Sequence, residues 1–243
     1  LILRGVAFEF RFKSSGKARR IWDASFHLGS FFAAFMQGVI IGAIVQGIEV
    51  EGRSYAGGAF DWLNVYSIIT GFAVVSGYVL LGGTWLVVKT DGETQAWARK
   101  SAADATGYVA AFLAVVSINM PIMNPDIRSL WFSIPNFFFL LPIPTASAIM
   151  LMTIWRDLHA EREVRPFLLS FGVFLTGYLG IFISMWPYIV PFKISFRQAA
   201  ATPESQSLLL VGTIILLPII LAYTGYCYYV FRGKVSHEHE GAY

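Results

Sequence analysis

Charged residues are scarce in this sequence. Asp, Glu, Lys and Arg make up only 14% of the 243 residues, whereas about 25% is usual in soluble domains. Hydrophobic residues make up 56%. Such a chain cannot cover its surface with polar groups, so we expect it to be surrounded by lipid. The small net charge of +3 is explained by membrane orientation and does not indicate nucleic-acid binding.

Cysteine and the motifs of soluble catalysis are also rare or missing. The single cysteine, Cys227, excludes an internal disulfide and a cysteine-based metal cluster, and its apolar surroundings predict a small buried hydrophobic residue. The sequence contains no Walker lysine motif, no Rossmann glycine pattern, and no HExxH, GxSxG or CxxC motif. It also has no row of carboxylates of the kind that many ion pumps carry. We therefore expect no self-sufficient active site.

Long apolar runs dominate what is present. About 20 apolar residues span the hydrocarbon core of a bilayer, and six runs meet this length: residues 22–50, 66–88, 105–123, 135–155, 167–192 and 208–231. Because backbone groups in lipid must be hydrogen-bonded internally, these runs predict helices.

The first twelve residues resemble the final turns of another membrane helix. The chain starts with Leu1 and shows no signal peptide, so we expect further helices upstream. The predicted fold is an all-α, polytopic transmembrane helix bundle. It is one domain, residues 1–243, with six full spans and the end of a seventh.

Positive charge alternates between the predicted loops. The strongest cluster, which the positive-inside rule places in the cytoplasm, consists of Arg11, Lys13, Lys17, Arg19 and Arg20. Alternation then places residues 51–65, 124–133 and 193–207 outside. Residues 89–100, residues 156–165 and the tail from Arg232 fall inside, so the C-terminus is predicted to be cytoplasmic.

Small and polar residues recur within the runs. Small residues at helical spacing, which permit close helix contacts, are Gly38 with Gly42, Gly71 with Ser76, and Gly172 with Gly177. Uncharged polar residues that we expect to form hydrogen bonds between helices include Gln37, Gln46, Asn119, Asn136, Thr145 and Thr176.

Two charged residues in the first apolar segment, Arg4 and Glu9, are candidate functional residues. Placing a charge at membrane depth costs about 2.5–3.5 kcal/mol or more. One interpretation is a buried or cavity-lining pair that serves proton movement. The other is an interfacial pair that anchors the helix end. Glu9 lies only two residues from Arg11, which favours anchoring for Glu9, whereas Arg4 lies about 10 Å deeper than Arg11 by helical rise.

Asp23 and His27 lie near the start of the next run, one helical turn apart on one face. Asp23 is expected to cap the helix, and the neighbouring Trp22 fits an aromatic belt. His27 could ligate haem. The other histidines fall in a predicted loop (His159) or the tail (His237 and His239), so a hydrogen-bonded or interfacial His27 is the better interpretation. The tail sequence HEHE could hold a stray metal ion, although a solvated tail is favoured.

Several separated strings together resemble one known family. They are RGVAFEFR at residues 4–11, Trp22-Asp23, Gly29-Ser30, Gln46-Gly47, the segment 60–93 and LPIILAYTGYCYYVFRGKV at residues 217–235. Their order and spacing resemble subunit II of cytochrome bd-type quinol oxidases, with some similarity to the cyanide-insensitive branch. The resemblance extends over essentially the whole chain.

The resemblance implies a nine-helix subunit of the bacterial cytoplasmic (inner) membrane in a complex that oxidises quinol and reduces dioxygen to water, contributing to the proton gradient. Haem b, haem d and the quinol site are then expected on subunit I, and no cofactor or metal is ligated by this chain. Expected partners are subunit I, small single-helix accessory subunits, membrane lipids and quinone, but no nucleic acid. The resemblance also makes Arg4, Glu9 and Asp23 candidate residues of a proton pathway.

Two alternatives remain. A secondary transporter typically has paired broken helices, which the proline pairs Pro142/Pro144 and Pro187/Pro191 could produce. A purely structural membrane subunit would need none of the charged residues for proton transfer.

Overall fold

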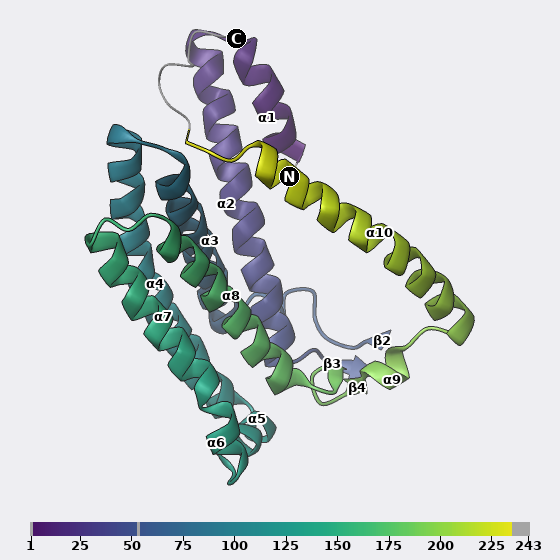
Figure 1. Ribbon diagram of the computed structural model, residues 1–243. Helices are drawn as coiled ribbons and strands as arrows, with labels where there is room; N and C mark the ends of the chain where they lie inside the picture. Colours follow the sequence, from purple (N-terminus) through teal and green to yellow (C-terminus); the bar gives the residue numbers. More distant parts are fainter. Residues whose placement is uncertain (1, 53, 235–243) are drawn as a thin grey trace.

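The computed structural model describes residues 2–52 and 54–234. Its helices are α1 (Ile2–Phe12), α2 (Gly16–Gln46), α3 (Val65–Lys89), α4 (Gly92–Met123), α5 (Pro125–Phe132), α6 (Asn136–Leu140), α7 (Pro142–His159), α8 (Val164–Met185), α9 (Phe196–Ala199) and α10 (Pro203–Val230) (Figure 1). Two short antiparallel hairpins pair β1 (Val50–Glu51) with β2 (Ser54–Tyr55) and β3 (Tyr188–Val190) with β4 (Ile194–Ser195).

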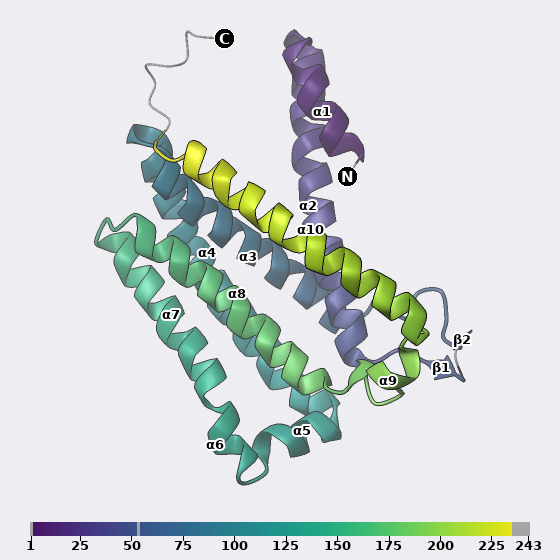
Figure 2. The ribbon, with the colours of Figure 1, turned by 45° about the vertical axis from the view of Figure 1, so that its right-hand side comes forward.

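Six segments of the described chain are long and apolar enough to cross a membrane. They are α2, α3, α4, the α6–α7 segment Asn136–His159, α8 and α10. This confirms the predicted all-α bundle and its six spans. The short helix α1 precedes them and folds back against α2 (Figure 2).

The helix ends differ from the predicted spans. Helix α4 begins at Gly92, so most of the predicted loop 89–100 is helical. Residues 124–133, also predicted as a loop, contain α5 because Asn124 accepts a hydrogen bond from the Asp126 amide and Pro125 occupies the first helical position. Helix α8 ends at Met185, ahead of the predicted residue 192. Hydropathy detects the lipid-crossing part of a helix, whereas caps and prolines determine where the helix starts and stops.

Glycines bring α2 and α3 into close contact. A Cβ atom built on Gly38 would lie 2.7 Å from the Gly71 Cα, and one on Gly42 would lie 2.6 Å from the Ser67 Cα. The predicted role of Gly38, Gly42 and Gly71 in packing is thus confirmed. Gly172 likewise leaves room for the Met150 sulfur, whereas a Cβ on Gly177 would meet no atom within 4 Å.

The core of the bundle lies between α3, α4, α7 and α8. Its most buried members are Leu80, Val87, Ala98, Ala102, Ala105, Val109, Leu151, Ile154, Leu158 and Val173. Small side chains let α3 and α4 approach, since a Cβ on Gly83 would lie 3.1 Å from the Ala102 Cβ. Lipid tails are as apolar as leucine, so shape fit and not water exclusion holds such a core together.

Hydrogen bonds add directional links between these helices. Thr84 Oγ1 lies 3.1 Å from Ser170 Oγ, joining α3 to α8, and Ser147 donates to Thr176 across α7 and α8 at 2.7 Å. Tyr78 donates to Gln37 at 2.7 Å. The predicted interhelical roles of Gln37 and Thr176 are therefore confirmed. Two other residues instead bond to the preceding turn of the chain: Thr145 donates to the Leu141 carbonyl and Asn119 donates to the Val115 carbonyl.

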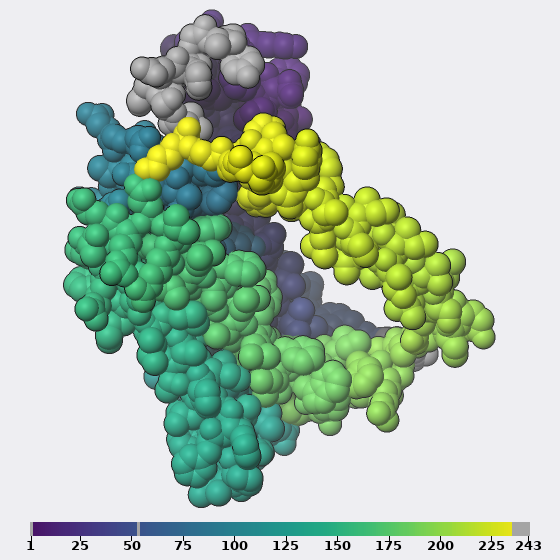
Figure 3. All heavy atoms as spheres, in the orientation of Figure 1, coloured from purple at the N-terminus to yellow at the C-terminus, as the bar shows by residue number. Residues whose placement is uncertain are grey.

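Helix α10 stands apart from the rest of the bundle. None of its residues is buried by the described part of the chain, including Cys227, which is half-buried rather than buried as predicted. An open gap separates the middle of α10 from the other helices (Figure 3). An apolar helix of 28 residues without a protein neighbour on most sides requires lipid or another protein around it.

The C-terminal end of α10 is nevertheless tied to the bundle. Lys89 donates to the carbonyls of Phe231 and Gly233 at 2.7 and 3.2 Å, which satisfies carbonyls that a helix end leaves unpaired. Lys234 forms ion pairs with Asp91 at 2.8 Å and Glu163 at 2.7 Å. These contacts join the end of α10 to the α3–α4 and α7–α8 connections.

Two pKa shifts give this link a defined pH range. The hydrogen bond from Lys234, and to a smaller extent that from Gln95, lowers the pKa of Glu163 below 4.5. The stability that Glu163 adds to the link is therefore full above pH 4.5 and is lost as the pH falls through the lowered pKa. The hydrogen bond to Asp91, and to a smaller extent that to Glu163, raises the pKa of Lys234 above 10.5. The stability that Lys234 adds to the link is therefore full below pH 10.5 and is lost as the pH rises through the raised pKa. The link is therefore fully present between these limits.

We expect Lys234→Met to loosen the end of α10 even at neutral pH. Spin labels on Cys227 and on a cysteine replacing Ser101 should give one narrow distance distribution between pH 5 and 10, which broadens outside that range. Lys234→Met should broaden the distribution at pH 7. Arg232→Met is the matched control, because Arg232 follows the end of α10 and stacks on Tyr229 of that helix. A narrow distribution in Lys234→Met would show that the ion pairs do not hold α10.

Candidate functional site

The candidate residues lie where α1 folds back onto α2. A tight turn reverses the chain at Gly16, whose φ of +58° favours glycine. Ala7 of α1 is 1% exposed, and a Cβ on Gly29 of α2 would lie 3.6 Å from the Arg4 nitrogen. That nitrogen is the backbone nitrogen of Arg4, so these two small residues let the helices pack closely along the segment that carries the charges.

The helical period sorts the charged residues of α1 onto two sides. Arg4 and Arg11 lie three residues before and four residues after the buried Ala7, so they share its face toward α2. Glu9 lies two residues after Ala7 and points to the opposite side. Arg4 and Glu9 therefore do not form the charge pair that was one interpretation of the sequence. Glu9 is exposed and makes no ion pair with any described residue.

Arg11 pairs with Asp23 across the α1–α2 turn. The Arg11 Nε donates to Asp23 Oδ1, and each side chain is 39% exposed. Asp23 was expected to cap its helix, and this is wrong: α2 begins at Gly16, two turns earlier, with Ser15 at the N-cap position. The pairing of Arg11 with Asp23 was not predicted from the sequence, because it depends on the turn at Gly16, which places these positions at similar heights on antiparallel helices.

Aromatic rings surround the charged groups. The Arg4 guanidinium lies 5.7 Å from the centre of the Phe26 ring, a cation–π distance. The rings of Phe10 and Trp22 are 5.3 Å apart. The side chains of Arg4 and Arg11 thus lie against α2 at two heights, Arg4 exposed and Arg11 partly buried.

The histidines do not gather at this site. His27 Nδ1 lies 2.6 Å from the Asp23 carbonyl, and His159 Nδ1 lies 2.7 Å from the Trp155 carbonyl. Each ring thus has one nitrogen satisfied by its own helix. His237 and His239 lie outside the described residues. Within the described part, no three His, Cys, Asp or Glu residues meet as a group that could hold a metal ion.

The arrangement provides carboxylates for proton transfer at two positions. Asp23 sits between the helices beside a fixed positive charge, whereas Glu9 faces away from α2 without a counter-charge. A carboxylate is a side chain that can accept and release a proton. Asp23 and Glu9 are thus the two groups of this segment with carboxylate chemistry.

Comparison with known proteins shows the family of this chain. A family model described as cytochrome bd terminal oxidase subunit II matches residues 1–231. Similar relatives are the cytochrome bd ubiquinol oxidase subunit 2 of Bacillus subtilis, 27% identical over 98% of this chain and 71% of the relative, and the cytochrome bd-I ubiquinol oxidase subunit 2 of Escherichia coli K12, 25% identical over 98% and 72%. A probable cytochrome oxidase subunit 2 of Haemophilus influenzae is 24% identical over 97% and 71%. The chain is therefore a multi-pass membrane protein that belongs to the cytochrome bd terminal oxidase subunit II family.

Proposed function

We propose that the chain is the haem-free subunit of a membrane quinol:dioxygen oxidoreductase. The family describes a subunit of an oxidase complex, which implies another oxidase subunit as partner. Haem b, haem d and the site of quinol oxidation belong, in this proposal, to that partner. Electron transfer from quinol to dioxygen would take place there, while this chain supports the partner and supplies protons.

The proposed partner surface includes α10. Its residues are covered by no described part of the chain, and its middle is separated from the bundle (Figure 3). Lipid or another apolar helix surface fits it equally by composition. We propose that the whole chain acts as one transmembrane domain in the bacterial inner membrane. The charge pattern of its loops supports a cytoplasmic C-terminus.

The proposed proton route passes along α1 and the start of α2. The observation that carries this proposal is Glu9, a carboxylate on the outer face of α1 without an ion pair in the described residues. Charges near lipid are costly unless a partner or water surrounds them. A partner subunit that covers Glu9 would enclose it beside a water-filled path, with Asp23 on the neighbouring helix and Arg4 holding positive charge on the face of α1 toward α2.

Replacing Glu9 by glutamine tests this role directly. We expect Glu9→Gln to lower quinol-dependent oxygen uptake at least tenfold, since positioned proton-transfer groups contribute about 10²–10⁴-fold. Glu9→Asp should retain most of the activity because it keeps the carboxylate. Oxygen electrode measurements and proton uptake in vesicles give the readout, and haem absorbance reports assembly.

The matched control is Glu93→Gln, which removes an exposed carboxylate from the first turn of α4. It should leave oxygen uptake unchanged. If Glu9→Gln also leaves both oxygen uptake and proton uptake unchanged, Glu9 has only an anchoring role and the proton route fails. The subunit assignment would still stand, because it rests on the family.

A further inference from the structure

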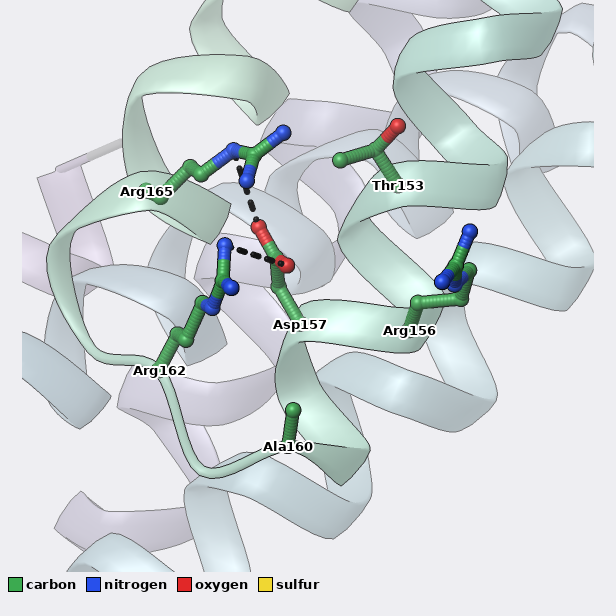
Figure 4. Close-up of a pocket in the computed structure, with 6 residues that line it drawn as sticks. All are labelled: Thr153, Arg156, Asp157, Ala160, Arg162 and Arg165. Atoms are coloured by element: carbon green, nitrogen blue, oxygen red, sulfur yellow. Dashed lines mark ion pairs between the residues drawn. The ribbon is translucent and has the colours of Figure 1, made fainter.

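A second group of charged residues lies far from α1, at the turn between α7 and α8. A cavity of about 240 Å³ opens there, several times the roughly 30 Å³ that one water occupies. The residues that line it are Thr153, Arg156, Asp157, Ala160, Arg162 and Arg165 (Figure 4). The proposed proton route uses none of these residues.

Asp157 holds two of the arginines in place. It is 5% exposed, and its oxygens lie 3.4 Å from Arg162 Nη1 and 3.2 Å from Arg165 Nε. Although Arg165 is this close, Asp157 Oδ2 has no aligned hydrogen bond within the described residues. A buried carboxylate is costly unless it is paired, so Asp157 fixes the two guanidiniums along one wall of the cavity.

Arg156 provides a third positive charge and makes no ion pair with any described residue. Its side chain stands apart from Asp157, on the other side from Arg162 and Arg165 (Figure 4). Three arginines and one aspartate leave two positive charges in excess around the cavity. Guanidiniums bind phosphate oxygens with pairs of hydrogen bonds, so the cavity fits a phosphate group.

The surroundings indicate that this phosphate belongs to a lipid. Exposed apolar side chains continue from the cavity toward the middle of the bundle on both helices. On α7, Met152 and Ile149 lie four and seven residues before Arg156, and on α8, Leu168 and Leu175 lie three and ten residues after Arg165. Helical spacing places each set on the face of its arginine. Two apolar stripes thus lead away from one cationic pocket.

The geometry points to a binding site for an anionic phospholipid at the α7–α8 turn. The headgroup phosphate would contact the guanidiniums of Arg156, Arg162 and Arg165, which together outnumber the single Asp157 carboxylate, and the acyl chains would follow the stripes on α7 and α8. Trp155, which is half exposed beside the pocket, suits the headgroup level of the membrane. Basic pockets between membrane helices commonly select anionic headgroups.

Arg156→Gln tests the site without disturbing Asp157 and its two partners. The intact complex is delipidated and titrated with phosphatidylglycerol, while native mass spectrometry counts bound lipid and thermal unfolding reports protection. We expect half-saturation at about tenfold higher phosphatidylglycerol in Arg156→Gln, the size of one lost charge-assisted hydrogen bond. Arg156→Glu should abolish the binding event. Arg128→Gln, at an exposed arginine of α5, should behave like the wild type.

Two further titrations separate the sources of the phosphate. Phosphatidylcholine should bind less tightly, because its choline carries a positive charge toward the arginines, and inorganic phosphate should give no protection at the same concentration. If inorganic phosphate protects the complex equally well, the pocket binds anions in general and is not a lipid site. Equal binding of phosphatidylglycerol to wild type, Arg156→Gln and Arg156→Glu would overturn the assignment altogether.

Discussion

Gly42→Leu is expected to prevent assembly of the complex. A Cβ at this position would lie 2.6 Å from the Ser67 Cα of α3, closer than the 3.0 Å that real Cβ atoms essentially never pass. The obstacle is backbone, which cannot rotate away as a side chain would. Leucine adds three further carbon atoms beyond this Cβ, more than a small shift of the helices can accommodate. The α2–α3 pair must therefore separate, and the neighbouring contact of Gly38 with Gly71 is lost with it. Haem absorbance and gel filtration of the purified complex measure the loss.

Alanine at the same position gives a graded version of this prediction. We expect Gly42→Ala to destabilise the chain by about 1–3 kcal/mol, the usual cost of overpacking. Gly107→Ala in α4 is the matched control, because a Cβ there would meet no atom within 4 Å. Gly107→Ala should raise the free energy of unfolding by up to about 1 kcal/mol, because alanine has a higher helix propensity than glycine. Opposite signs for the two alanines would support close packing at Gly42, whereas a neutral Gly42→Ala would refute it.

The six crossings could be predicted from the sequence because lipid imposes a simple rule on composition and length. The helix ends could not, since they depend on local groups that hydropathy ignores. Helix α5 is an example: Asn124, Pro125 and Asp126 form a recognisable helix start, yet the segment is too short and polar to register as a span. The sequence makes Pro187 and Pro191 candidate helix breakers, but both follow the end of α8, which removes one pointer to a transporter.

The candidate site was only partly predictable. The residue types were found, because charges within or beside apolar runs stand out. Their pairing was not found, because it depends on the turn at Gly16 and on which face of α1 meets α2. The pocket around Asp157 left a weaker signal: one acidic residue among Arg156, Arg162 and Arg165 at the end of an apolar helix. Only the fold shows that this acid is buried and that the arginines surround a cavity.

The second large effect on activity is expected at Asp23, where a role in holding the helices together can be separated from a role in proton transfer. Asp23→Asn should lower quinol-dependent oxygen uptake at least tenfold if Asp23 passes protons. Its effect on stability should be small, at most about 1 kcal/mol, because the ion pair with Arg11 is more than one-third exposed and is screened by solvent. A large loss of turnover with an intact haem spectrum is the expected pattern.

Exchanging the two charges completes the test. The double variant Arg11→Asp with Asp23→Arg keeps an ion pair between α1 and α2 but moves the carboxylate from one helix to the other. If the carboxylate on α2 relays protons, the exchange should restore thermal stability while oxygen uptake and proton uptake remain low. If both recover together, the ion pair itself is what the complex requires, and Asp23 holds the helices without carrying protons. A proton route through α2 depends on the first outcome, because the arginine that replaces Asp23 stays protonated and cannot pass protons on.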